Sequence, residues 1–157
     1  FIDLSFVNLE GANFSKANLT KGELWGNKTA GTIFIKANMT NASISDSGQR
    51  VGFIEVDFSF ANLAGARLRG NFDKANFTNV NLKGAEFAGS SDYPPSINGT
   101  IFLGADMSST KMKYVNLKEA IFCETLLPWG NDNSGCEKLF NQEIEKSNEN
   151  FDDIPGF

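Results

Sequence analysis

A five-residue period constrains the fold of this chain more than any other feature. From Val56 to Phe87 a large apolar residue recurs at every fifth position, with one residue missing after the third member: Phe58, Leu63, Leu68, Phe72, Phe77, Leu82 and Phe87. Two places before most of these stands a small residue or a valine, such as Ala61, Ala66 and Ala75. A period of five fits neither an amphipathic helix nor the sustained alternation of an ordinary strand, so the pattern predicts an internal structural repeat.

The same period extends over most of the chain. It runs through Leu4, Leu9, Phe14, Leu19 and Leu24, then Phe34, Met39 and Ile44, and finally Phe102, Met107, Met112, Leu117 and Phe122. Three segments interrupt it, at residues 25–31, 45–52 and 88–100. Within each unit the small, polar and large residues alternate in, out and in, as in a very short strand, and the next two residues suit a solvent-facing corner. Each unit therefore predicts one side of a coil.

Several units have closely similar sequences: ANFSK, ANLTK, ANLAG, ANFTN and VNLKG. They resemble the A(D/N)LXX consensus of the pentapeptide-repeat family, and the resemblance covers residues 1–125. It implies an all-β solenoid, a right-handed quadrilateral β-helix with four units to a coil, in which the small and the large residue both point inward. About six such coils, spaced ~4.8 Å apart, make a rod on the order of 30 Å long.

Residues one coil apart, 19 or 20 positions along the sequence, should stack in inward columns. Three columns are expected: Phe14, Phe34, Phe53 and Phe72; Leu4, Leu24, Ile44, Leu63, Leu82, Phe102 and Phe122; and Leu19, Met39, Phe58, Phe77, Ile97 and Leu117. Phe87 and Phe102 are three units apart, so the loop at residues 88–100 is expected to replace sides of the coil. The residue missing after Leu68 suggests one coil shortened by a residue, with its columns kept.

The segment after the repeat is expected to cover the end of the solenoid, because open ends expose unpaired backbone. Ser134 followed by Glu137 fits a capping box, and a helix is expected from Cys136 to about Ser147, with Leu139, Phe140 and Ile144 mostly on one face. We expect this helix to lie over the last coil. The chain then divides into a β-helix, residues 1–125, and a helical cap with an acidic tail, residues 126–157.

Two cysteines, Cys123 and Cys136, bracket the connection between the last coil and this helix. Their position suggests a disulfide that ties the cap to the rod, with two free thiols as the alternative. The segment FCETLLPWGNDNSGC also resembles the one that closes a cyanobacterial and chloroplast subset of the family, although Leu127 and Trp129 depart from its pattern. In that subset the two cysteines form a disulfide, and members with leader peptides are exported to the periplasm or the thylakoid lumen. A disulfide requires an oxidising compartment, and this agrees with export to the periplasm or the thylakoid lumen.

Charge separates the body from the tail. Residues 1–123 carry 12 Lys and Arg against 11 Asp and Glu, whereas residues 124–157 carry 2 against 8. A uniformly acidic rod would imitate the phosphate backbone of DNA, and a basic stripe would bind it. The nearly neutral body fits neither, so no nucleic-acid partner is expected.

Catalytic and cofactor chemistry is not indicated. The chain contains no histidine, which removes the commonest general base and most zinc and iron sites, and no phosphate-binding glycine motif is present. The acidic residues of the body fall mostly at outward positions around the rod: Asp57, Asp73, Glu86 and Asp106. We expect no catalytic residue, no metal, no cofactor and no enzyme activity. Seven Asn-x-Ser/Thr triplets follow from the repeat consensus and are not read as glycosylation sites.

Aromatic and proline residues in the interrupting segments are the expected contacts for a protein partner. They are Trp25, Tyr93, Pro94, Pro95 and Trp129, and the alternative is that each covers a local gap. Phe6 and Phe60 occupy outward positions and would add to an apolar patch.

The first hypothesis for function is a non-catalytic structural or interaction solenoid in the thylakoid lumen, with the bacterial periplasm as the alternative location. Its expected partner is a larger assembly such as a membrane-embedded photosynthetic complex, reached from the lumenal side. The second hypothesis is a nucleic-acid mimic that binds a DNA topoisomerase, as gyrase-protecting members of the family do. The chain contains no apolar run long enough to span a membrane.

Overall fold

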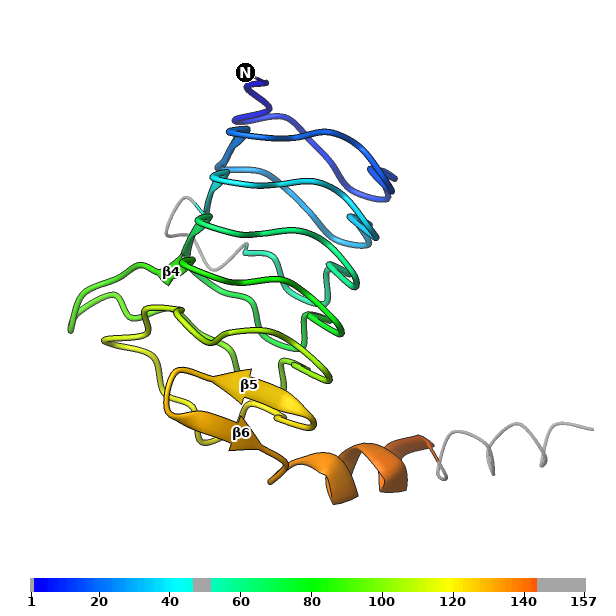
Figure 1. The fold of residues 1–157 in the computed structure, drawn as a ribbon. Coiled ribbons are helices and arrows are strands. Elements are labelled where there is room, and N and C mark those ends of the chain that lie inside the picture. The colour runs from blue at the N-terminus through cyan, green and yellow to red at the C-terminus, as the bar shows by residue number, and fades with distance from the viewer. Residues whose placement is uncertain (1, 47–51, 144–157) are drawn as a thin grey trace, which may run out of the picture.

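The backbone winds into a rod of stacked coils (Figure 1). The computed structural model describes residues 2–46 and 52–143. Four short strands lie one above another in a parallel sheet of order β1-β2-β3-β4: β1 Glu23–Trp25, β2 Ser43–Ser45, β3 Arg67–Arg69 and β4 Glu86–Phe87. Isolated parallel bridges continue this stack from Asp3 to Glu23 and from Glu86 to Lys111. Segments far apart in the sequence therefore lie side by side along the rod axis.

Each coil has four sides. In the first coils the bridged residues are 20 positions apart, which is four five-residue units: Asp3 with Glu23, Asn8 with Lys28, Asn13 with Ile33, and Asn18 with Asn38. We call the side that contains β1–β4 the first side, and number the second, third and fourth sides along the chain. The quadrilateral β-helix that the repeat implies is the fold of the chain.

The corners are built from the backbone of each unit. The amide of the small residue donates to the carbonyl of the large residue three places before it, as Ala12 does to Leu9 at 2.9 Å. The residue just before the small one has a positive φ, 68° at Gly11 and 63° at Lys16. The residue before the large one accepts, through its side-chain oxygen, the amide two places on; Asn13 accepts that of Ser15 at 2.9 Å. These turns explain why small, Asn or Asp, and Gly or Lys recur in the consensus.

The interior is filled by the large and small residues together. Ala61 and Ala75 are buried, as the repeat predicts, beside the large residues of the same coils. The inward column of the third side consists only of phenylalanines, whose successive ring centroids lie 4.9–5.4 Å apart: Phe14, Phe34, Phe58, Phe77, Phe102 and Phe122. Ring stacking of this kind adds to the apolar burial of each residue.

The expected columns are wrong beyond Ile44. Ile33 bridges Asp57, 24 positions on, and Asn76 bridges Ile101, 25 positions on, because two coils are longer than four units. The first-side column is Leu4, Leu24, Ile44, Leu68, Phe87 and Met112, and the fourth-side column is Leu19, Met39, Leu63, Leu82, Met107 and Leu127. The loop at residues 88–100 therefore adds residues to a coil and does not replace sides. The shortened coil is confirmed: Phe53 stacks on Phe72, 19 positions on, at 5.5 Å.

The segment at residues 25–31 stays within the coil, contrary to the expected interruption. Lys28 bridges Asn8, and Thr29 occupies the inward position with 1% exposure. The Asn27 side chain takes the place of a small residue and donates to the carbonyls of Leu4 and Val7, at 2.6 and 2.9 Å. Polar residues are accepted at these inward positions because they bond to the backbone of neighbouring coils. Trp25 consequently belongs to strand β1 and not to a loop.

A hairpin and a disulfide close the C-terminal end. Strand β5, Thr125–Leu127, continues the stack because Leu126 bridges Asp106, and it pairs with the antiparallel β6, Gly130–Asp132. The expected boundary between residues 125 and 126 therefore falls inside a strand. The Cys123–Cys136 disulfide is formed, with a Cα–Cα distance of 4.7 Å. It joins the hairpin region to a helix over residues 136–143.

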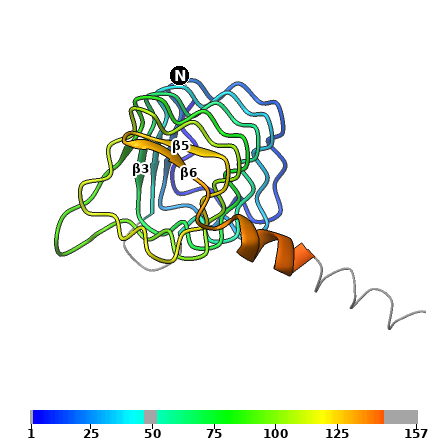
Figure 2. The ribbon, with the colours of Figure 1, turned by 60° about the horizontal axis from the view of Figure 1, so that its bottom comes forward.

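The described part of this helix does not lie over the last coil, contrary to the expected cap. It leads away from the coils in both views (Figures 1 and 2), and Phe140 is 62% exposed. Met112 and Leu117, in the last layer, are only partly buried. Cys136 lies at the first turn of the helix, so the disulfide fixes that end and leaves the rest to point outward. Ile144 and the acidic tail lie outside the described residues. Among the described residues there is no helix with the length and apolarity needed to cross a bilayer.

Candidate interaction surface

All variation in coil length lies at one corner of the rod, which we call the variable corner. It connects the first side to the second, and its described residues are 25–28, 45, 46, 52, 69–71 and 88–96. The inward residues that flank it are five positions apart at Leu24 and Thr29, nine at Ile44 and Phe53, four at Leu68 and Phe72, and ten at Phe87 and Ile97. At the other corners of these coils the inward residues are five positions apart. A rigid scaffold that varies in one place is the usual way to present a binding surface.

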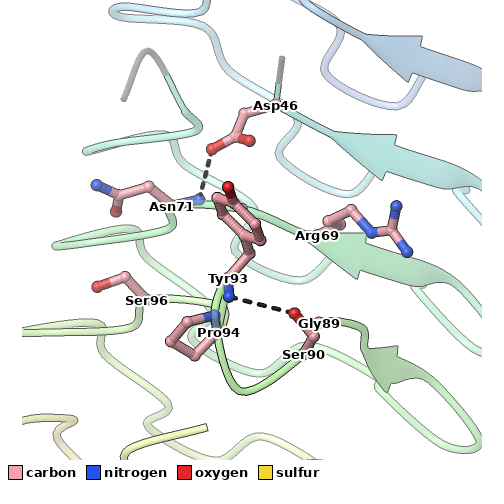
Figure 3. A pocket seen from close by; sticks show the side chains of 9 residues that line it. Asp46, Arg69, Asn71, Gly89, Ser90, Tyr93, Pro94 and Ser96 are labelled. Carbon is pink, nitrogen blue, oxygen red and sulfur yellow. Dashed lines mark hydrogen bonds between the residues drawn. The ribbon is translucent and has the colours of Figure 1, made fainter. Parts of the chain in front are cut away.

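A cleft of about 430 Å³ opens at the variable corner (Figure 3). Its residues come from three successive coils: Asp46, Arg69, Gly70, Asn71, Gly89, Ser90, Tyr93, Pro94 and Ser96. Tyr93 is 81% exposed and stands across the cleft, with its hydroxyl toward Asp46 and Asn71 in Figure 3. The cleft therefore offers an aromatic wall bordered by polar groups.

The loop that carries Tyr93 is held by short-range bonds. The Ser90 amide donates to the Tyr93 carbonyl at 3.2 Å, and the Tyr93 amide donates to the Ser90 hydroxyl at 3.2 Å. A Cβ on Gly89 would lie 2.6 Å from Pro95 Cδ, so the base of the loop admits only glycine without rearrangement. Pro95 is buried beneath this contact, whereas Pro94 is exposed.

Asp46 closes the opposite side of the cleft. Its carboxylate accepts the Asn71 amide at 3.0 Å and so joins the corner of one coil to the next. Gly70 lies directly beneath with a φ of 109°, and a Cβ there would lie 2.2 Å from the carboxylate. Both the backbone conformation and the space therefore require glycine at this corner.

A second, shallower hollow of about 270 Å³ adjoins the cleft on the first side. It is lined by Ser43, Ile44, Ser45, Arg67 and Arg69, so Arg69 borders both hollows. Arg67 and Arg69 point outward on either side of the buried Leu68. Within the described residues neither guanidinium forms an ion pair; the pairs present are Lys74 with Glu55 and Lys83 with Asp106.

The residues expected to contact a partner are only partly brought together. Tyr93 and Pro94 line the cleft, while Pro95 is buried and is not available to a partner. Trp25 is 51% exposed on β1, in register with Ser45 and Arg69 of the next two strands. Trp129 is 66% exposed in the turn between β5 and β6, at the C-terminal end. Three of the five expected residues, Trp25, Tyr93 and Pro94, therefore lie at the variable corner, and the other two do not offer a contact there.

Phe6 and Phe60 are exposed, as expected, but they lie at different corners. Phe6 is at the variable corner of the first coil, where its ring packs on Trp25 with centroids 5.0 Å apart. Phe60 lies at the corner between the third and fourth sides, with the Lys36 ammonium 5.6 Å from its ring centre. Phe6 and Trp25 therefore form a small exposed apolar contact at this corner.

The two carboxyls with shifted pKa values lie outside both hollows. Hydrogen bonds from the backbone and side chain of Ser5 lower the pKa of Asp3. Burial acts to raise the pKa of Asp106, but hydrogen bonds from Ser108 and Lys83 and the Lys83 charge outweigh it, so this pKa is also lowered. Among the described residues no cluster of three or more His, Cys, Asp or Glu side chains is placed to hold a metal ion.

The comparison with protein families identifies the repeat. Residues 1–26 and 53–91 match the family described as pentapeptide repeats, in eight copies. These two ranges consist of pentapeptide repeats. The described residues between the matched ranges, 27–46 and 52, belong to the same stacked coils, and the nine-residue step from Ile44 to Phe53 shifts the repeat frame. Proteins of this family are non-catalytic interaction solenoids. No curated protein sequence matches the chain.

Several solved pentapeptide-repeat structures resemble this chain at low sequence identity. HetL from Nostoc sp. strain PCC 7120, described as involved in heterocyst differentiation regulation, is 21% identical over 82% of this chain and 67% of its own, with a TM-score of 0.29. A form of QnrB1, a plasmid-mediated fluoroquinolone resistance protein, is 16% identical over 85% and 89%, with a TM-score of 0.43. A protein of the Arabidopsis thaliana thylakoid lumen is 23% identical over 76% and 68%, with a TM-score of 0.20. The fold assignment rests on the family match and on the coils themselves.

Sequence reasoning did not single out Arg67, Arg69 or Asp46. Outward positions of a pentapeptide repeat accept almost any polar residue, so two arginines there form no pattern that stands out. The available signal was the spacing of Arg67 and Arg69. Residues two apart on either side of an inward leucine must both point outward.

Proposed function

We propose that this pentapeptide-repeat solenoid is a non-catalytic accessory protein of the thylakoid lumen, bound to a larger complex such as a photosynthetic one through its variable corner. One observation carries the proposal: the changes in coil length, the cleft and the exposed Trp25, Tyr93 and Pro94 all lie at the same corner, and the second hollow adjoins it on the first side. Exposed aromatic residues beside a recess are the usual anchors of protein interfaces. Trp129 would make a separate contact at the C-terminal end.

The disulfide supports the compartment. A Cys123–Cys136 bond persists in an oxidising space such as the thylakoid lumen or the bacterial periplasm, and it would be reduced in a cytosol. The segment that contains it resembles the closing segment of the lumenal subset. In this proposal about six coils in residues 1–125 carry the binding surface, and residues 126–157 form the disulfide-tied end.

The alternative proposal, a nucleic-acid mimic that binds a topoisomerase, has less support. Residues 1–123 carry 12 basic and 11 acidic side chains, so the rod does not present the continuous negative charge that imitates a phosphate backbone. A supercoiling assay with DNA gyrase distinguishes the two proposals. We expect no inhibition and no protection by the purified chain.

The proposed function is tested by fractionation of thylakoids from the source organism. Mild-detergent extracts are separated on native gels, and the chain is detected with an antibody. We expect it in the lumenal fraction and in a band of higher mass than the free protein, shared with subunits of one photosynthetic complex. Recovery only as a free monomer, or only outside the lumen, would overturn the proposal.

A further inference from the structure

The outer surface of the first side forms a trough over strand β2. Alternation along each strand leaves two outward residues beside each buried one: Glu23 and Trp25 on β1, Ser43 and Ser45 on β2, and Arg67 and Arg69 on β3. The two serines are the shortest of these side chains. The hollow of about 270 Å³ lies over them, with Arg67 and Arg69 along one edge. Because adjacent strands are ~4.8 Å apart, the β1 and β3 side chains flank a groove wide enough for one extended chain.

Arg67 and Arg69 present two guanidinium groups at a fixed spacing. Outward residues two apart on a strand are separated by ~6.5 Å, and carboxylates two apart on an extended peptide have the same spacing. Within the described residues no carboxylate forms an ion pair with either arginine, although Glu86 is the residue paired with Arg67 on β4. An arginine binds a carboxylate through two parallel hydrogen bonds. The edge of the trough is therefore complementary to two acids in alternate positions.

The trough continues into the cleft at the variable corner through Arg69. Figure 3 shows the Arg69 side chain along β3 and Tyr93 on the far side of the cleft. The Asp46 carboxylate also borders the cleft, where it accepts the Asn71 amide. Tyr93 and Pro94 offer apolar and aromatic surface to a neutral side chain. The trough is therefore bordered by the positive charges of Arg67 and Arg69, whereas the cleft offers the apolar surface of Tyr93 and Pro94, with the acidic Asp46 at its edge.

We propose that this groove, formed by the trough and the cleft, binds an extended acidic segment of a partner protein. The segment lies over β2, places carboxylates on Arg67 and Arg69, and directs an aromatic side chain into the cleft against Tyr93. This inference rests on the proposed function, because it specifies which surface the protein partner occupies and what chemistry the partner contributes. A nucleic-acid strand is disfavoured, because its continuous phosphates would also meet Glu23, Glu86 and Asp46.

The test measures binding of labelled ten-residue peptides to the full, oxidised chain by fluorescence anisotropy at low salt. The matching peptide carries Glu at positions 4 and 6 and Phe at position 8 in a Gly/Ser background. The control peptide has the same composition with the two Glu adjacent. We expect the matching peptide to bind about fivefold more tightly, because only its carboxylates reach both arginines.

Matched variants separate the arginines from net charge. Arg67→Gln combined with Arg69→Gln is expected to weaken binding of the matching peptide by about tenfold or more. Lys118→Gln combined with Lys138→Gln removes the same charge from exposed residues that line neither hollow and lie outside the variable corner, and is expected to change binding by less than about twofold. All four positions are exposed, so thermal unfolding should be nearly unchanged. Equal losses in the two double variants, or equal binding of both peptides, would overturn the proposal.

A nucleic-acid probe and the native complex complete the test. Duplex DNA of 20 base pairs that competes with the peptide, and whose binding is lost with Arg67 and Arg69, would overturn the choice of a protein segment. The wild-type chain and the double arginine variant are also compared on native gels of thylakoid extracts. If both migrate with the same complex, this groove is refuted and the proposed function stands. Arginine-dependent peptide binding by a chain found only as a free monomer would refute the proposed function and keep the groove.

Discussion

The third side and the variable corner of this rod meet opposite requirements. The third side keeps one phenylalanine at each inward position through coils of 19, 20, 24 and 25 residues, and its rings remain stacked. The variable corner absorbs every change in length and carries the cleft, and the second hollow lies beside it on the first side. Because additions and deletions are confined to one corner, the stacked sides stay in register. Stability and recognition are thus assigned to different parts of each coil.

The largest effect is expected from breaking the phenylalanine column. Phe77 is fully buried and packs against the rings of Phe58 and Phe102. Phe77→Ala removes these contacts and leaves a cavity between stacked coils, so the free energy of unfolding should fall by ~3–5 kcal/mol. Denaturant unfolding followed by circular dichroism measures the change. Leu117→Ala, on the second side of the partly covered last layer, is the comparison and should cost clearly less; equal costs would contradict a stabilising role specific to the column.

Removal of the disulfide should have the next largest effect. The bond closes a segment with a sequence separation of 13 residues, at the end where stacking on four sides is incomplete. Cys123→Ser combined with Cys136→Ser is expected to cost ~2–4 kcal/mol by the loop-closure estimate. Thermal unfolding of the wild type with and without reductant gives an independent measurement. An unchanged midpoint in both experiments would show that the hairpin β5–β6 holds the end without the bond.

A glycine at a regular corner tests the backbone geometry common to all units. Gly84 has a φ of 68°, and no atom lies within 4 Å of a Cβ built there. Gly84→Ala should therefore cost about 1 kcal/mol from the left-handed conformation alone, without a steric clash. Lys16→Gly is the converse change, at a φ of 63°, and should leave stability unchanged or raise it. A neutral Gly84→Ala would mean that the corner relaxes out of the left-handed region.

The period of five predicted the inward pairs such as Ala75 and Phe77 and the shortened coil between Phe53 and Phe72, whereas the four-sided coil was implied by the resemblance of the units to pentapeptide repeats. The period could not predict the register past Ile44. A loop that adds residues to a coil and a loop that replaces one of its sides leave the same sequence spacing between the inward residues on either side of the loop. The bonds that decide this, such as the Asn76–Ile101 bridge, join distant residues. One signal was present: only coils of 24 and 25 residues place all six phenylalanines in one column. The position of the described helix, residues 136–143, was mispredicted for a related reason, since helix periodicity does not determine the direction in which a helix leaves its disulfide.

The outward arginines escaped sequence reasoning because their meaning depends on which strands lie beside them. Arg69 becomes part of a groove only when the structure places Ser45 above it and Tyr93 across the corner. The aromatic residues were easier to select, since an exposed tyrosine or tryptophan is unusual in itself. Even so, Trp25 was expected in a loop and lies on a strand.

The smallest effect on stability is expected from shortening the variable corner. Deleting residues 90–94 leaves Gly89 followed by Pro95, which gives Phe87 and Ile97 the five-residue spacing of a regular unit. Gly89 would then occupy the corner position that tolerates a positive φ. Pro95 is buried in the place of a small residue but has no amide to donate to the Phe87 carbonyl, so the deletion is combined with Pro95→Ala. The free energy of unfolding should change by less than about 1 kcal/mol, because the removed residues contribute only loop bonds and loop entropy. Deleting residues 79–83 also removes five residues in frame, but it takes Leu82 and one whole side, so the columns below it are displaced and cooperative unfolding should be lost. If the two deletions were equally harmful, the variable corner would be part of the stabilising scaffold, and the division of roles between corner and column would fail.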